Sequence, residues 1–322
     1  MSSWNLRNED KMELLRVSAS EYKQVFPTPY SLFNSVEFSE LNKEKCNDLH
    51  YLMFADKKKR LGIIVGEKDD SLRAPFSATY SGFSYNTAVA LNHYDEACKL
   101  LREYVERLNK PLYITLPPPL YDGLDQSKTL GAMMRAGAKI QYIDYNHHFE
   151  LSRFADYDSI LDSKVRNKLH KSLDSGLKFE ILNSKIDDDV ARAYEVIRIN
   201  HRERGNPLHM TLENVLETIK IIPADFFIVS NQEGIDVAAA QIFHTSRDTY
   251  QIVYWGDIPS FSHLKSMNYL SYKVFEYYFG KDVKRLDIGI STEKGAPNYG
   301  LCEFKENIGC YSTTRFSLIL EG

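Results

Sequence analysis

The sequence predicts an α+β protein of two domains, each a mixed sheet flanked by helices. Its 322 residues exceed the span of about 100–200 typical of one domain. A hydrophobic content of 43% is sufficient for two packed cores. The expected elements follow a similar order in both halves, although the sequence itself does not repeat. We therefore expect one domain at residues 1–152 and a second at residues 153–322.

The first half is expected to be strand-rich, with one clear amphipathic helix. Alternating apolar residues indicate strands, and apolar residues three and four apart indicate helices. The expected elements are an irregular segment at 1–45, strands at 49–55 and 61–65, a loop at 73–85, a helix at 92–108, a strand at 111–116, a short helix at 131–137, and strands at 139–145 and 147–151.

The second half begins with a basic helix at 163–174, which is expected to end before Gly176 because glycine commonly follows a helix. Its lysines Lys164, Lys168 and Lys171 share one face, as spacings of three and four require. The further expected elements are a strand at 178–182, a helix at 187–202, a helix from 211, strands at 226–230, 237–245 and 250–255, a helix at 263–279 and a strand at 286–290.

Bulk properties exclude several classes of protein. The net charge is −4, which argues against a dedicated nucleic-acid binder. No apolar run approaches the about 20 residues of a membrane helix, and the polar N-terminus does not resemble a signal peptide. The four cysteines form no C-x-x-C pair, so we expect free thiols in the cytoplasm and no metal site.

The last third of the chain carries the strongest functional pattern. A strand at 286–290 leads into a loop rich in glycine and proline, and Lys305 then returns toward the strand end. Just upstream, an aromatic strand at 250–255 precedes a helix whose N-terminus offers unpaired N–H groups, which can bind phosphate. This order predicts a site at the edge of the sheet.

Several stretches of residues 160–312 resemble the FemAB-like branch of the GNAT superfamily of N-acyltransferases. They are SKVRNKLHKSLDSGLKFEI, RINHRERGNPLHMTLENV, NYLSYKVFEYYFGKDVKRLDIG and GLCEFKENIG, with weaker matches in APFSATYSGF and YNHHFEL of the first half. The resemblance implies two GNAT-like (acyl-CoA N-acyltransferase-like) domains in tandem. It also implies transfer of an acyl or aminoacyl group to an amine.

One departure from the wider superfamily concerns the donor. Acetyl-coenzyme-A enzymes carry a glycine-rich turn before the central helix, whereas the equivalent loop here, residues 256–263, contains only Gly256. Such a loop wraps a pyrophosphate less closely. The implied donor is therefore either an acyl-CoA or an aminoacyl-tRNA. The acceptor would be a small or nucleotide-linked amine, such as a cell-wall or surface-polysaccharide precursor, and tRNA is a possible partner.

Three residues are candidates for the chemistry. Lys305 can stabilise a developing oxyanion, because a positioned cation acts most strongly where water is excluded. Glu303 and Asp287 are candidate general bases, because the attacking amine must lose a proton. The alternatives are a surface lysine on a strand and solvated carboxylates.

Six residues are candidates for substrate binding. Arg202, Arg204 and His209 surround a Gly-Asn-Pro turn and suit an acidic acceptor, although a solvated loop is the alternative. Tyr254 and Trp255 would line an acyl slot, and Asn268 would bind backbone or donor; the alternative for all three is an ordinary structural role.

We therefore expect an N-acyltransferase of the FemAB-like kind. The alternatives are a coenzyme-A-dependent GNAT enzyme that acts on a small amine or amino sugar, and a non-catalytic binding module that retains the fold.

Overall fold

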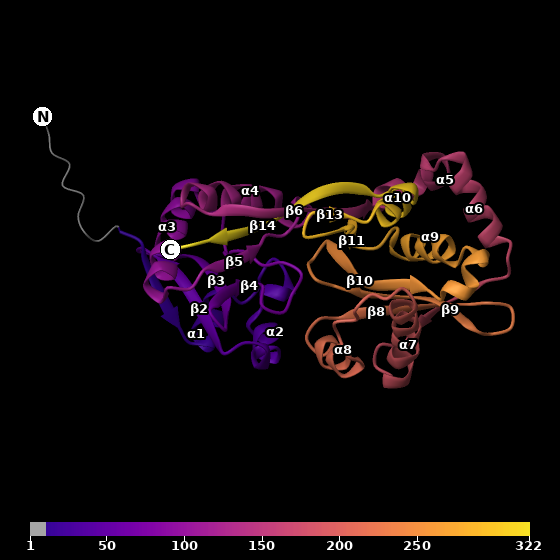
Figure 1. Ribbon diagram of the computed structural model, residues 1–322, viewed down its shortest axis with the longest axis horizontal. Coiled ribbons are helices and arrows are strands. Elements are labelled where there is room, and N and C mark those ends of the chain that lie inside the picture. Colours follow the sequence, from indigo (N-terminus) through magenta and orange to yellow (C-terminus); the bar gives the residue numbers. More distant parts are fainter. Residues whose placement is uncertain (1–10) are drawn as a thin grey trace, which may run out of the picture. The chain divides into compact units, whose positions relative to one another are not determined.

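The computed structural model describes residues 11–322, apart from the side chains of residues 122–124. The chain forms two compact units (Figure 1). Unit 1 contains the residues up to 144 together with residues 314–322, and unit 2 contains residues 145–313. The division predicted from the sequence lay between residues 152 and 153. It placed the C-terminal residues in the second domain, whereas residues 314–322 belong to unit 1.

Unit 1 is a sheet with helices on both faces. Its strands follow the order β1-β2-β3-β4-β5-β14, and only the β4/β5 pair is parallel. Its elements are β1 (Glu13–Val17), α1 (Ala19–Val25), α2 (Val36–Leu41), β2 (Asp48–Ala55), β3 (Lys59–Lys68), β4 (Ser71–Ala74), α3 (Leu91–Leu108), β5 (Leu112–Thr115), α4 (Pro119–Arg135), the start of β6 (Lys139–Glu150) and the end of β14 (Tyr311–Leu320).

Alternation along β2 creates the two faces of this sheet. Leu52 and Phe54 belong to a core that includes α3, while Tyr51 and Met53 pack with α1 and α2. A strand places successive side chains on opposite faces, so one hairpin serves both cores.

Several expectations for unit 1 were wrong in detail. The segment expected to be irregular contains β1, α1 and α2, and α1 begins at a capping box in which Ser18 and Glu21 bond to each other's backbone N–H. The short helix expected near 131 is the last part of α4. That helix starts at Pro119, because proline fits the first turn of a helix. The two strands expected at 139–151 are one strand, β6.

Unit 2 repeats this strand pattern. The order is β6-β11-β10-β9-β8-β7, and only the β10/β11 pair is parallel. Its elements are the end of β6, α5 (Tyr157–Ile160), α6 (Ser163–Leu173), β7 (Lys178–Leu182), α7 (Asp187–Glu203), α8 (Leu212–Ile219), β8 (Ala224–Ser230), β9 (Asp236–Phe243), β10 (Thr249–Asp257), α9 (Ser266–Tyr278), β11 (Arg285–Ile290), β12 (Thr292–Glu293), β13 (Ala296–Pro297), α10 (Tyr299–Asn307) and the start of β14.

Helix α9 supports the centre of the second sheet. Leu270, Val274 and Phe275 are fully buried, and the Phe275 ring stacks on Phe149 of β6 with centroids 3.9 Å apart. The fold class is therefore confirmed: each unit is a mixed sheet flanked by helices. Among the described residues, no helix combines the length and apolar character that a bilayer span requires.

Candidate active site

The central feature of unit 2 is a cavity between two strands that separate. β10 and β11 pair at only three positions, from Thr249 with Arg285 to Gln251 with Asp287. Beyond them β10 continues to Asp257 without pairing to β11. A cavity of about 710 Å³ lies between residues 252–257 of β10, the end of β11, and the helices α7, α9 and α10. Its volume falls within the range of small-molecule sites.

Irregularities in both strands accompany this separation. The register of β10 against β9 shifts between Ile252 and Tyr254, and that of β11 against β6 shifts between Asp287 and Gly289. Gly289 has a φ of 74°, which other residues rarely adopt. Bulges of this kind bend a strand and are common beside active sites.

Lys305 fixes the bent end of β11. It lies on α10 rather than on a strand and is 2% exposed. Its ammonium group donates hydrogen bonds to the carbonyl oxygens of Ile288, Gly289 and Ile290, each at 2.9 Å. Lys305 also lines the cavity, so a buried positive charge lies on its wall, and the predicted catalytic role of this lysine stays a prediction.

Asp287 fixes the other side of the same bulge. Its carboxylate is fully buried and accepts hydrogen bonds from Asn146 Nδ2 (2.7 Å), the Gly289 amide (2.9 Å) and Gln251 Nε2 (3.1 Å). Asp287 is not among the residues that line the cavity. Its predicted role as a general base stays a prediction.

Glu303 does not line the main cavity. It is exposed on α10 and borders a smaller hollow of about 230 Å³, together with Lys168 of α6 and Asn268 of α9. Of the three predicted catalytic residues, the structure places Lys305 alone on the wall of the main cavity.

Four of the six predicted substrate-binding residues line that cavity: Arg204, Tyr254, Trp255 and Asn268. Arg202 and His209 are exposed and are not part of the lining. The Arg204 guanidinium donates to Asp257 Oδ1 at 3.0 Å, so this arginine is already paired with a carboxylate.

The sequence reasoning did not single out His201, which also lines the cavity. Its Nδ1 lies 3.1 Å from the carbonyl oxygen of Pro207. A carbonyl only accepts, so Nδ1 carries the proton and Nε2 keeps a lone pair. Burial is the main cause that lowers the pKa of His201 below its ordinary value, which favours the neutral ring. The sequence did contain a signal for His201, because it lies near the end of the expected helix and directly precedes Arg202, which was a candidate for substrate binding.

The loop at residues 256–263, which was compared with the phosphate-binding turn of coenzyme-A enzymes, packs tightly and is partly helical. Gly256 gives space to a neighbouring helix, because a Cβ there would lie 2.5 Å from the Asn200 side chain of α7. The following residues form a short 3₁₀ helix (Pro259–Leu264), so α9 begins at Ser266 rather than at 263. Ser266 Oγ donates to the Asp257 carboxylate at 3.4 Å, which places a negative charge beside the helix start.

A buried histidine beside Lys305 predicts a loss of stability at acidic pH. His147 is 1% exposed and pairs with Ser291 Oγ at 3.0 Å. Burial, the nearby Lys305 charge and the neighbouring His148 lower the pKa of His147 to about 4. The mostly exposed Glu306 carboxylate lies 3.8 Å from Nε2.

Below pH 6.5 the unfolded chain binds a proton at this position and the folded chain does not, so unfolding becomes more favourable as the pH falls toward 4. Each pH unit is worth about 1.4 kcal/mol. Urea unfolding at pH 7 and pH 4.5 should therefore show a loss about 2 kcal/mol larger for the wild type than for H147Q. Equal losses would contradict this assignment.

Two units of this topology, with parted parallel strands in unit 2, define the fold of tandem GNAT-like proteins. No family model and no curated protein matches the sequence. Solved structures do match in fold. FemX aligns with a TM-score of 0.68 at 12% identity, over 96% of this chain and 97% of that one.

Two further structures match over comparable lengths. The C-terminal domain of a putative lysylphosphatidylglycerol synthetase from Agrobacterium fabrum aligns with a TM-score of 0.62 at 13% identity, over 95% of this chain and 93% of that one. A tandem GNAT protein from the clavulanic acid biosynthesis pathway aligns with a TM-score of 0.55 at 9% identity, over 96% and 98%. The chain thus has the fold of the FemAB-like branch of the GNAT superfamily, as the resemblance implied.

Proposed function

We propose that this protein is an N-acyltransferase that moves an aminoacyl group from an activated ester to an amine. The observation that carries the proposal is the cavity between β10 and β11, with the buried Lys305 charge on its wall. Beyond Gln251, β10 has no β11 partner, so its backbone polar groups on that side are open to a ligand. An extended acyl arm can bind there as an added strand.

The start of α9 favours an aminoacyl ester over a coenzyme A thioester as the donor. A coenzyme A pyrophosphate would bind at this helix start, where the Asp257 carboxylate already accepts hydrogen bonds from Ser266 Oγ and the Arg204 guanidinium. A pyrophosphate would have to compete with this carboxylate for both groups. An aminoacyl-tRNA presents its 3′-terminal adenosine and a cationic amino group there, and the exposed lysines of α6 offer contacts for its phosphates.

The reaction assigns distinct tasks to the cavity residues. The acceptor nitrogen forms a bond to the ester carbonyl carbon, the ester C–O bond breaks, and the proton that the acceptor loses ends on the leaving oxygen, which departs as the ribose hydroxyl of the tRNA. His201 Nε2 is the group proposed to take that proton, because its lone pair is available and its pKa is lowered. All three N–H donors of Lys305 bond to backbone carbonyl oxygens, so its charge, rather than a hydrogen bond, would stabilise the negative charge that develops on the ester carbonyl oxygen. The general-base roles predicted for Asp287 and Glu303 are the alternative.

The acceptor is proposed to be anionic. Lys265 and Asn206 line the cavity and offer donors for a phosphate or carboxylate, and Arg204, which bonds Asp257 through Nη2, keeps further N–H donors for the same ligand. A nucleotide-linked precursor of the cell wall or a surface polysaccharide fits this chemistry. The coenzyme-A-dependent alternative keeps one supporting observation, which is that Ser262 and Lys265 also line the cavity just before α9.

Two donor analogues separate these alternatives in one experiment. Puromycin reproduces an aminoacyl-adenosine 3′ end, and coenzyme A reproduces the thioester donor. We expect puromycin to raise the melting temperature and coenzyme A to leave it unchanged. We also expect the protein to transfer radioactive label from a mixed pool of aminoacyl-tRNAs to a peptidoglycan nucleotide precursor. A shift with coenzyme A alone would support the alternative enzyme, and no shift or transfer in either arm would support a binding module.

A further inference from the structure

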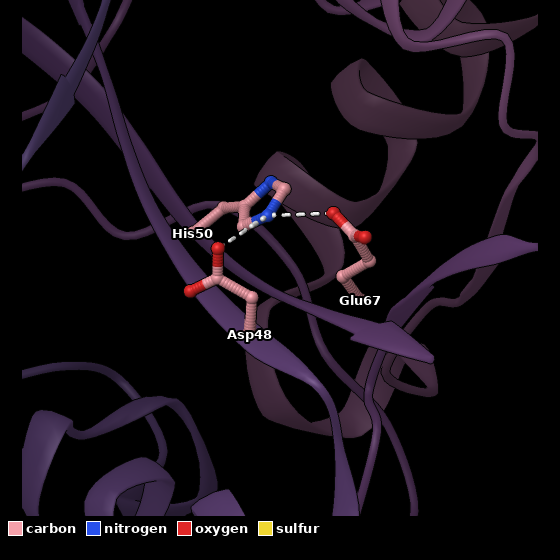
Figure 2. Close-up of side chains that lie close together, drawn as sticks. All are labelled: Asp48, His50 and Glu67. Carbon is pink, nitrogen blue, oxygen red and sulfur yellow. Dashed lines mark ion pairs between the residues drawn. The ribbon is translucent and has the colours of Figure 1, made fainter. Parts of the chain in front are cut away.

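A cluster of metal-binding groups lies in unit 1, outside the site described above. Asp48 and His50 lie two residues apart on β2 and therefore on the same face of the strand. Glu67 of β3 pairs directly with Asp48 in the antiparallel register. Figure 2 shows the His50 ring directed between the two carboxylates.

The spacing of the three ligand atoms matches a small divalent ion. His50 Nε2 lies 3.1 Å from Glu67 Oε2 and 3.7 Å from Asp48 Oδ2. Ligand atoms about 2.0–2.1 Å from a tetrahedral zinc ion are about 3.3 Å apart, so the observed distances bracket that value. The three ligand atoms all lie within 4.8 Å of one another.

His50 supplies an independent indication of a ligand. Its side chain is fully buried, and Nε2 has only the two carboxylates within ion-pair distance, with no hydrogen bond of accepted geometry within the described part of the chain. A buried polar atom of this kind calls for an explanation. Its Nδ1 lies 2.9 Å from the Tyr104 hydroxyl of α3. Such a partner on the second nitrogen is usual for a metal-binding histidine, because it sets the orientation of the ring.

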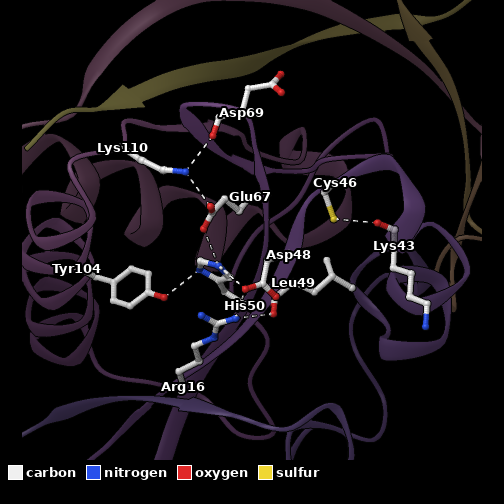
Figure 3. A network of polar contacts seen from close by, with 10 residues as sticks. All are labelled: Arg16, Lys43, Cys46, Asp48, Leu49, His50, Glu67, Asp69, Tyr104 and Lys110. Atoms are coloured by element: carbon white, nitrogen blue, oxygen red, sulfur yellow. Dashed lines mark hydrogen bonds and ion pairs between the residues drawn. The ribbon is translucent and has the colours of Figure 1, made fainter.

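The neighbouring cations orient the carboxylates without covering every ligand atom (Figure 3). Lys110 bonds Glu67 through Oε1 at 2.7 Å, which leaves Oε2 directed at His50. Arg16 donates to Asp48 Oδ2 at 2.6 Å, but this oxygen has a second lone pair and both side chains are about half exposed. The exposed side of Asp48 also gives an ion a path to the cluster.

We propose that Asp48, His50 and Glu67 form a zinc site that ties β2 to β3. One imidazole and two carboxylates suit zinc better than magnesium or calcium, which prefer all-oxygen ligands. Three protein ligands leave a fourth position to water. This proposal departs from the absence of a metal expected from the sequence, and it is independent of the transferase activity.

The zinc site can be tested on the full chain. The protein is first treated with EDTA to remove any metal and is then transferred to buffer without chelator. Isothermal titration with zinc chloride should show one ion bound per chain, and cobalt chloride should produce visible absorption from a bound ion. Zinc should also raise the melting temperature. The variants D48N and E67Q preserve shape at an exposed and a partly buried position, so they carry less folding risk than replacement of the fully buried His50.

Each of these variants should weaken zinc binding at least as much as the about 10–100-fold typical of changes around a metal site. The matched control is D158N, which alters the exposed carboxylate 2.7 Å from His170 in unit 2 and should leave binding unchanged. The proposal is overturned if the wild type binds no zinc, if D48N and E67Q both bind as well as the wild type, or if D158N weakens binding equally.

Discussion

Replacement of Lys305 by methionine is expected to lower the free energy of unfolding by about 3 kcal/mol, the range seen when one partner of a buried charged group is removed. The three carbonyl oxygens of residues 288–290 would lose their common donor at once. Each unsatisfied buried acceptor costs about 1–3 kcal/mol, and relief from burying an ammonium group offsets part of the sum. Methionine has a similar length, so packing changes little.

Urea unfolding at neutral pH measures this effect, with K171M as the matched control. Lys171 is exposed on α6, and its replacement should change stability by no more than about 0.5 kcal/mol. We also expect K305M to lose turnover, because the bent end of β11 would relax toward β10. A K305M protein as stable as the wild type would show that the lysine does not hold the bend.

The sequence predicted the strand, the glycine bend and the returning lysine, but not the helix that carries Lys305. Residues 299–307 contain Gly300 and mixed aromatic and charged residues, which weakens a helical pattern. The structure supplies the missing signal, because Asn298 caps α10 by accepting from the Leu301 amide at 3.0 Å. Asparagine is a favoured N-cap residue, so Asn298 could have indicated the start of a helix, but it was assigned to the loop.

Features that depend on distant pairing could not be predicted from local patterns. Strand β14 pairs with β5, so that Ser317 lies opposite Thr115, and this long-range contact moves residues 314–322 into unit 1. The zinc-binding cluster likewise depends on the register that places Glu67 opposite Asp48. Periodicity indicates which residues face a core, but not which strand lies alongside.

Replacement of His201 by glutamine is expected to lower turnover by about 10²–10⁴-fold, the range typical of a lost general base. Glutamine keeps a similar size and can still donate to the Pro207 carbonyl, but it does not titrate. In the wild type the neutral ring is the active form, so kcat/KM should fall as the pH drops through the His201 pKa. Because burial lowers this pKa, the acidic limb should lie below pH 6.5.

The pH profile separates a base from a structural residue. H201Q should lose the acidic limb as well as rate, while H170Q, at an exposed position on α6, should retain both. Parallel profiles of E303Q and D287N test the two carboxylates predicted from the sequence. An unchanged limb in H201Q together with its loss in E303Q would transfer the proton-accepting role to the smaller hollow beside Lys168. The acceptor amine would then approach from the α6 side of α10, rather than from the end of α7.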